Sequence, residues 1–202
     1  LNHWTEDFGH KEYKATLENC NEPKHLYVHI PFCAKLCHYC ICNIVITNDR
    51  PKIQFFLDHL LREIDNLKAF YGDHLPKIEE IHLGGGTPNH LARDQLCQLC
   101  DRLSTLCGLQ LRLLREFAME IDPRLVKEGD IEFYASLGIS RVSFGIQDFD
   151  EEVQKAINRV QPFEMVKEVL KDRIYLRHGV NFDLLYGLPK QTHDTVRKTL
   201  DQ

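Results

Sequence analysis

The sequence lacks any apolar run near the roughly 18–20 residues that cross a bilayer, and it has no hydrophobic N-terminal signal. It also lacks a cluster of basic residues, and its formal net charge is -5. Nucleic acid is therefore disfavoured as the main partner, because phosphate binding needs a concentrated basic surface. Repeats, low-complexity tracts and long linkers are absent. These absences predict a cytoplasmic globular protein without membrane or nucleic-acid partners.

The 202 residues are enough for one domain with a sizeable core. The first residue is Leu1 rather than methionine, and Gln202 falls inside a predicted helix. We therefore expect a fragment of a longer protein. Its parts are predicted to be an N-terminal segment, 1–24, and one domain over 25–202 that is truncated at its C-terminal end.

Strand-like apolar runs alternate with helical patterns along the chain. The expected strands are 26–30, 78–83, 116–122, 140–147 and 180–187, and the expected helices are 52–70, 91–106, a segment ending near 135, 151–157, 163–172 and one from 192. Five strand–helix units in a row indicate a parallel sheet covered by helices.

Polar residues follow each predicted strand, where barrel-like α/β folds build their active face. They are a cysteine-rich loop, Gly84–Thr87, Glu120 with Asp122, Gln147 and Asp183. An open nucleotide-binding sheet is the alternative fold. However, "GGGTP" at 84–88 lacks the G-x-G-x-x-G spacing, and no G-x-x-x-x-G-K-[ST] loop exists.

Four of the eight cysteines lie within 33–42. A disulfide framework is disfavoured by the expected reducing compartment and by the strain of such small loops. Structural zinc usually takes two separated cysteine or histidine pairs, and Cys97-x-x-Cys100 is the one candidate for a second pair. We interpret Cys97 and Cys100 as part of a Leu-rich helix, and Cys20 and Cys107 as structural too. The third alternative is an iron–sulfur cluster, which soft thiolates suit.

The spacing Cys33-x-x-x-Cys37-x-x-Cys40 after the first strand, with Tyr39 before the third cysteine, resembles the radical S-adenosylmethionine (SAM) superfamily. The resemblance implies that these cysteines bind three irons of a [4Fe–4S] cluster and that the fourth iron binds SAM. "GGGTP" is similar to the glycine-rich SAM loop of that superfamily. The implied fold is α/β, a partial (β/α) barrel of the radical SAM type with about five strand–helix units.

Further motifs resemble the oxygen-independent coproporphyrinogen III oxidase family: "LYVHIPFC", "CNIVIT", "EIDPR", "LGISRVSFGIQDFDEEVQKAINR" and "NFDLLYGLPKQT". In that family a SAM-derived radical takes hydrogen from a propionate of coproporphyrinogen III. Loss of CO₂ and of one more electron then gives a vinyl group, and two rounds give protoporphyrinogen IX. The resemblance implies a flavodoxin- or ferredoxin-like electron donor and a monomeric full-length enzyme. Related haem-binding chaperones usually carry phenylalanine where this chain has Cys42, so Cys42 favours the enzyme over that alternative.

The resemblance assigns roles residue by residue. Cys33, Cys37 and Cys40 match the cluster ligands, and Cys42 and His29 are the catalytic candidates. His29 is equally compatible with a packed histidine. Positions that match SAM contacts are Tyr27, Gly85, Gly86, Thr87 and Glu120 for the first SAM, and Tyr39, Gln147, Arg159 and Asp183 for a second. Asp122 is interpreted as a helix start. Ile41 replaces a glycine of the family, which bears on the second SAM pocket and on the placement of Cys42.

Overall fold

The computed structural model describes residues 9–20 and 22–202. Of the predicted N-terminal segment 1–24, residues 1–8 and 21 lie outside the described residues. The rest of that segment contains a helix that the sequence analysis did not predict, α1 (His10–Asn19), followed by the start of the first strand, β1 (Lys24–Ile30). None of the helices in the described ranges is both long and apolar enough to span a bilayer.

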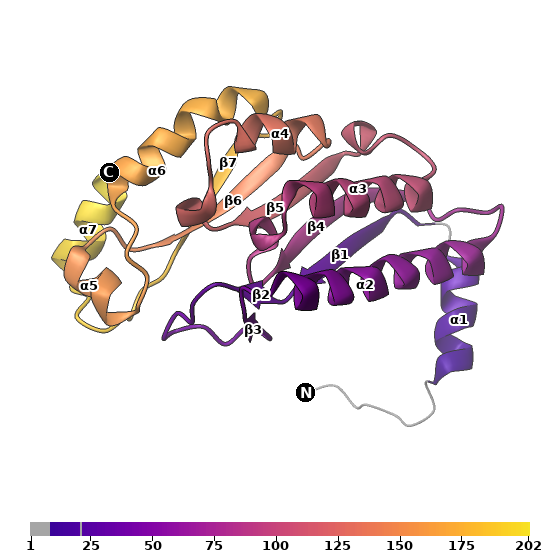
Figure 1. The fold of residues 1–202 in the computed structure, drawn as a ribbon, viewed down its shortest axis with the longest axis horizontal. Coiled ribbons are helices and arrows are strands. Elements are labelled where there is room, and N and C mark those ends of the chain that lie inside the picture. Colours follow the sequence, from indigo (N-terminus) through magenta and orange to yellow (C-terminus); the bar gives the residue numbers. More distant parts are fainter. Residues whose placement is uncertain (1–8, 21) are drawn as a thin grey trace.

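The main sheet has five parallel strands in the order β1-β4-β5-β6-β7 (Figure 1). Its further strands are β4 (Ile78–Gly85), β5 (Glu116–Ile121), β6 (Arg141–Gln147) and β7 (Val180–Leu184). Spatial order follows chain order, and a helical segment links each strand to the next, so the predicted series of five strand–helix units is confirmed. Within the described residues the sheet does not close, and β1 and β7 form its edges.

The helices are α2 (Arg50–Tyr71), α3 (Arg93–Cys107), α4 (Asp130–Ser136), α5 (Glu151–Ala156), α6 (Phe163–Val169) and α7 (His193–Asp201). Two predicted helices are shorter than expected. Residues 123–125 form a 3₁₀ turn, and α4 begins only after Gly129, whose φ of 74° interrupts a helix. The helix predicted over 163–172 ends as α6 at Val169 and tightens into a 3₁₀ turn, Leu170–Tyr175.

The core lies between the sheet and the helices in front of it in Figure 1, α2, α3 and α4. It buries Ile53 and Leu57 of α2 and Leu99 of α3, together with Leu83 and Phe117 of the strands. The strands are not apolar on the other face of the sheet. That face carries polar side chains, among them His82, Glu116, Glu120, Arg141, Asn181 and Asp183. The described helices leave it uncovered, so these side chains keep contact with solvent or with one another.

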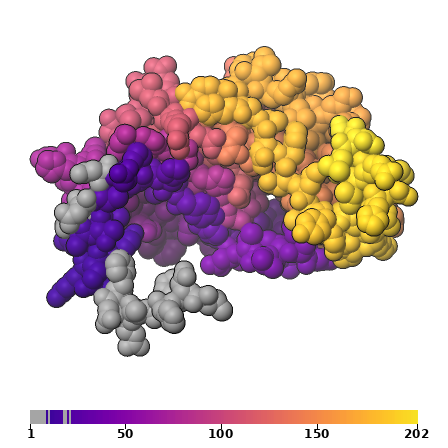
Figure 2. Space-filling view, turned by 180° about the vertical axis from the view of Figure 1, so that it is seen from behind, coloured from indigo at the N-terminus to yellow at the C-terminus, as the bar shows by residue number. Residues whose placement is uncertain are grey.

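A short ladder closes the base of the cysteine-rich loop. β2 (Phe32–Cys33) pairs in parallel with β3 (Val45–Ile46), and the amide of Thr47 donates to the carbonyl of Cys33 at 3.1 Å. The loop thereby leaves and re-enters the fold at the carboxyl ends of the strands. In Figure 2 its purple surface meets the yellow C-terminal segment, in agreement with the packing of Tyr39 against the cluster of Val153, Ile157 and Leu188.

Candidate functional site

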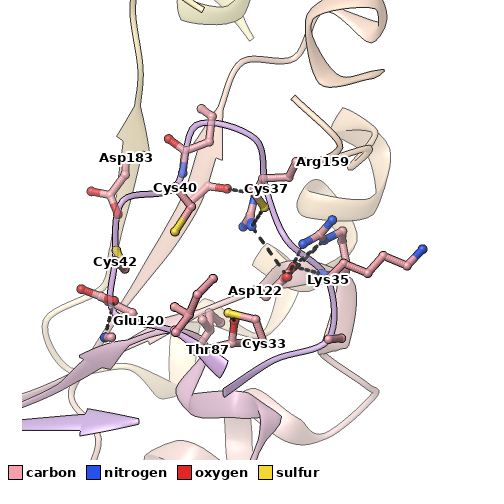
Figure 3. A pocket seen from close by; sticks show the side chains of 18 of the residues that line it. Cys33, Lys35, Cys37, Cys40, Cys42, Thr87, Glu120, Asp122, Arg159 and Asp183 are labelled. Atoms are coloured by element: carbon pink, nitrogen blue, oxygen red, sulfur yellow. Dashed lines mark hydrogen bonds and ion pairs between the residues drawn. The ribbon is translucent and has the colours of Figure 1, made fainter. Parts of the chain in front are cut away.

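One cavity of about 200 Å³ lies at the carboxyl edge of the sheet (Figure 3). Its walls come from the cysteine-rich loop, the turn after β4, and the strands β5, β6 and β7. It brings together nearly all the residues that the sequence singled out: Cys33, Cys37, Tyr39, Cys40, Cys42, Gly85, Gly86, Thr87, Glu120, Gln147, Arg159 and Asp183. Tyr27 and His29 are the two predicted site residues that do not line it.

Each thiol of the loop has a polar neighbour. Cys33 lies 3.3 Å from the Thr87 hydroxyl, Cys37 lies 3.7 Å from Arg159 Nη1, and Cys40 and Cys42 lie near each other. Burial raises the pKa of the Cys33 and Cys42 thiols, with Thr87 partly opposing it at Cys33. The Cys33 and Cys42 thiols are therefore protonated at neutral pH in the metal-free chain. In the described ranges no three Cys, His, Asp or Glu side chains converge tightly enough to hold a single metal ion.

The glycines of the turn after β4 are required by the packing of the chain itself. Gly85 has a φ of 116°, and a Cβ there would lie 2.7 Å from the His29 ring. A Cβ on Gly86 would lie 2.8 Å from the backbone of Pro31. Neither position tolerates a side chain, because the turn lies directly against the end of β1. The cysteine-rich loop and the "GGGTP" turn thus form one wall.

Glu120 is already oriented by the protein. One carboxylate oxygen accepts from the Gly85 amide at 3.2 Å, and the other lies 3.1 Å from His82 Nε2. The carboxylate remains partly exposed beside the cavity. It is therefore available to a cationic group of a bound molecule.

The side chains of Tyr27 and His29 are hydrogen-bonded to each other at the edge of this wall. The Tyr27 hydroxyl lies 3.0 Å from His29 Nδ1, and His29 Nε2 lies 2.8 Å from the carbonyl of Asn43. A carbonyl only accepts, so Nε2 carries the proton and the Tyr27 hydroxyl donates to Nδ1. This geometry gives His29 a structural task in positioning the loop, while its catalytic role stays a prediction.

The sequence placed Asp122 at the active edge of the sheet but gave it only the role of a helix start, so its ionic role was missed. Asp122 caps the 3₁₀ turn as predicted, because its carboxylate accepts from the amide of Arg124 at 3.0 Å. The same carboxylate is buried in the cavity wall and forms ion pairs with Arg124 and Arg159. Burial opposes ionisation, yet Arg124 and Arg159 together hold the pKa of Asp122 below its ordinary value. The available signal was the acid–base pair at the end of a strand in "EIDPR".

Backbone strain marks Gln147 at the end of β6. Its φ of 68° is unusual for a residue other than glycine, and the pairing register of β6 with β7 shifts there. The bulge places the Gln147 side chain against Gly145, where a Cβ would lie 2.7 Å from the amide nitrogen. Strain of this kind is concentrated at ligand sites, which agrees with the predicted contact.

Ile41, which replaces the family's glycine, is compatible with the loop. Its side chain is 98% exposed, and its backbone is not among those with positive φ. Cys42 still lines the cavity. The substitution therefore places an apolar side chain in solvent without displacing Cys42.

The donor set fits an iron–sulfur cluster of the kind the sequence indicates. Three thiols and open space lie together, and soft thiolates are the ligands that such clusters take. Each thiolate of a cubane cluster binds a different iron, so the three sulfurs need not converge on one point. The profile of the radical SAM superfamily matches residues 27–202. The chain belongs to the radical SAM superfamily.

Comparison with individual proteins shows which radical SAM enzymes this chain resembles. It is 43% identical over 184 residues to the oxygen-independent coproporphyrinogen III oxidase of Pseudomonas aeruginosa, covering 89% of this chain and 39% of that protein. The Escherichia coli protein of the same name is 36% identical over 200 residues, which is 98% of this chain and 43% of the relative. The solved coproporphyrinogen III oxidase of E. coli, described as a radical SAM enzyme, superposes with a TM-score of 0.88 over 97% of this chain and 45% of that one, at 35% identity.

A structure with much lower sequence identity shares only the fold with this chain. A radical SAM methyltransferase from Kitasatospora setae matches with a TM-score of 0.61 at 17% identity. The chain spans less than half the length of the coproporphyrinogen oxidases it matches. The predicted fold class, a radical SAM α/β sheet with outer helices, is confirmed.

Proposed function

We propose that this chain is the catalytic core of an enzyme that decarboxylates the propionates of coproporphyrinogen III to vinyl groups without oxygen, giving protoporphyrinogen IX. The observation that carries the proposal is the convergence of the three cluster cysteines and Cys42 on one cavity with every SAM-contact position except Tyr27. The similarity to oxygen-independent coproporphyrinogen III oxidases supports it.

Cys33, Cys37 and Cys40 would hold a [4Fe–4S] cluster, and the open part of the cavity would take SAM. When bound, cluster and SAM together supply a 5′-deoxyadenosyl radical that abstracts hydrogen. The protein contributes orientation and exclusion of side reactions. The ladder of β2 and β3 fixes where Cys33 stands relative to the rest of the loop.

The polar residues of the cavity divide into two sides in Figure 3. Glu120 and Asp183 lie on the side of Cys42, while Arg159 and Asp122 lie beside Cys37. Glu120 would bind the amino group of SAM, because its carboxylate is preoriented by the Gly85 amide. The arginine side is suited to a carboxylate of SAM or of substrate.

The remaining proposed SAM contacts come from the cysteine-rich loop, the turn after β4, the strands β1, β6 and β7, and the segment after α5. The first SAM would be contacted by Gly85, Gly86 and Thr87, together with Tyr27. The Tyr27 hydroxyl is hydrogen-bonded to His29. Tyr39, Gln147, Arg159 and Asp183 would contact the second. Burial raises the pKa of Tyr39, so its hydroxyl stays protonated and remains a hydrogen-bond donor.

Cys42 and His29 are proposed as catalytic residues, with Cys42 facing the cavity and His29 acting from behind Gly85. The proposed enzyme works in the cytoplasm as a monomer and takes electrons from a flavodoxin- or ferredoxin-like protein. Nothing in the described ranges favours the alternative of a haem-binding chaperone.

The test is anaerobic reconstitution of the chain with iron and sulfide, followed by SAM and a strong reductant. We expect release of 5′-deoxyadenosine that is lost in Cys33→Ala and retained in the matched variant Cys97→Ala, whose thiol lies on α3 outside the cavity. Coproporphyrinogen III decarboxylation is then measured in a protein with the full length of the relatives. A cluster that never cleaves SAM would contradict radical chemistry, and SAM cleavage without decarboxylation would contradict the substrate.

A further inference from the structure

Asp122 holds two guanidinium groups at once. Its carboxylate accepts from Arg124 Nε at 2.9 and 3.1 Å and from Arg124 Nη2 at 2.6 Å. The Nη1 of Arg159 lies 3.7 Å from the same carboxylate. The side chains of Asp122 and Arg159 are only 9% and 10% exposed, so solvent screens this group weakly. We call Asp122, Arg124 and Arg159 the Asp122 clamp.

Both arginines of the clamp reach one thiol. Arg159 Nη1 lies 3.7 Å from Cys37 Sγ, and Arg124 lies near enough to the same thiol for their charges to interact. The other ligand positions have neutral partners, the Thr87 hydroxyl at Cys33 and the Cys42 thiol at Cys40. The surroundings of the three thiols are therefore asymmetric, with the cations concentrated at Cys37.

Two guanidiniums at such close range repel each other unless an anion lies between them. The Asp122 carboxylate supplies that anion, and its bidentate contact fixes the plane of the Arg124 fork. The clamp keeps a net positive charge because two cations share one carboxylate. Its placement against the thiol therefore depends on Asp122, although Asp122 itself makes no contact with Cys37 among the described hydrogen bonds.

We propose that Asp122 is a positioning residue that holds Arg124 and Arg159 against Cys37 and thereby raises the reduction potential of the cluster. Reduction adds an electron to a cluster that is already anionic through its thiolates. Positive charge and hydrogen bonds at a ligand sulfur stabilise the reduced state. The inference rests on the cluster-binding part of the proposed function and not on its substrate.

The experiment is a potentiometric titration of the anaerobically reconstituted chain without SAM, followed by electron paramagnetic resonance of the reduced cluster. Arg124→Gln keeps a polar side chain but removes the charge, and we expect a shift of the midpoint to more negative potential. Arg124→Lys keeps the charge but loses the bidentate contact, so a smaller shift in the same direction is expected. The matched control is Asp65→Asn in the Arg102–Asp65 pair between α2 and α3, which lines no part of the cavity and leaves the midpoint unchanged.

The role of Asp122 is isolated by a double-mutant cycle. Asp122→Asn keeps a side-chain oxygen for the cap but loses the charge that holds both arginines. We expect Arg124→Gln to shift the midpoint much less in the Asp122→Asn background than in the native one. A purely structural role would lower cluster content without this coupling.

The outcomes distinguish a failure of the inference about Asp122 from a failure of the proposed function. Equal shifts in both backgrounds, or no shift from Arg124→Gln, would overturn the inference and leave the proposed function standing. Failure of the native chain to form any cluster would overturn both.

Discussion

The side-chain amide of Asn158 donates to the carbonyl of Leu36 at 2.7 Å, joining two segments 122 residues apart. Asn158 follows α5 in the left-handed conformation, with a φ of 57°. The neighbouring carbonyl of Ile157 accepts from the amide of His38 at 3.0 Å. The segment after α5 thus holds the cysteine-rich loop on both sides of Cys37, at Leu36 and at His38.

This contact predicts a graded response at Asn158. Asn158→Gly keeps the left-handed backbone and loses only the hydrogen bond, so we expect the free energy of unfolding to fall by about 1 kcal/mol. Asn158→Ala adds the strain of an L-residue with positive φ and should lose about 2 kcal/mol. Denaturant unfolding measures both. Equal losses in the two variants would show that the backbone conformation at 158 does not contribute.

The buried cysteines of α3 should be chemically inert. Burial raises the pKa of Cys100 to about 12 and that of Cys107 to about 11. At neutral pH their thiolate fractions, and therefore their alkylation rates, are low. In the cluster-free chain we expect iodoacetamide to modify exposed Cys42 first and Cys100 and Cys107 last, as read by mass spectrometry. Early labelling of Cys100 in the folded chain would contradict the packing of α3, and unfolded chain provides the control.

The pair of Glu116 and Arg141 on the polar face predicts a pH-dependent stability. Two hydrogen bonds from Arg141, at 2.7 and 2.9 Å, outweigh burial and lower the pKa of Glu116. A carboxylate with a depressed folded-state pKa contributes stability above its unfolded pKa of about 4.3 and loses it as the pH falls through the folded value. Glu116→Gln should therefore lower the free energy of unfolding by about 1 kcal/mol at neutral pH.

Urea unfolding of the cluster-free chain over a pH series measures the difference, which should close as the medium becomes more acidic than the ordinary glutamate pKa. The matched control is Glu151→Gln, since Glu151 is 74% exposed beside Lys155 and should change stability little. A difference that persists at low pH would assign the effect to packing rather than to charge.

Self-association is expected at the open edge formed by β7. This strand leaves one side of its backbone unpaired among the described residues, and Phe182 and Leu184 on it are 45% and 41% exposed. Leu184→Lys should reduce concentration-dependent oligomers measured by size-exclusion chromatography with light scattering. Leu113→Lys removes an apolar residue that is even more exposed, at 66%, in a 3₁₀ turn outside β7, and it should not reduce them. A monodisperse native chain would contradict this prediction.

The sequence by itself determined the order of strands and helices and the chemistry of the cysteine-rich loop. Strand–helix alternation and the C-x-x-x-C-x-x-C spacing are local patterns, and local patterns depend on side-chain period and ligand type alone. That is why the five strands lie close to their predicted residues, and why Cys33, Cys37 and Cys40 were named before any geometry was known.

Only the tertiary structure decided which residues share the cavity wall. Asp122 looked like a helix cap and is one, but its pairing with Arg159 depends on how β5 and the segment after α5 meet in space. His29 shares a strand with the SAM-contact position Tyr27, yet the close approach of Gly85 places it behind the wall. Such contacts join residues far apart in the chain, so no window of sequence encodes them and the packing of the whole sheet sets them.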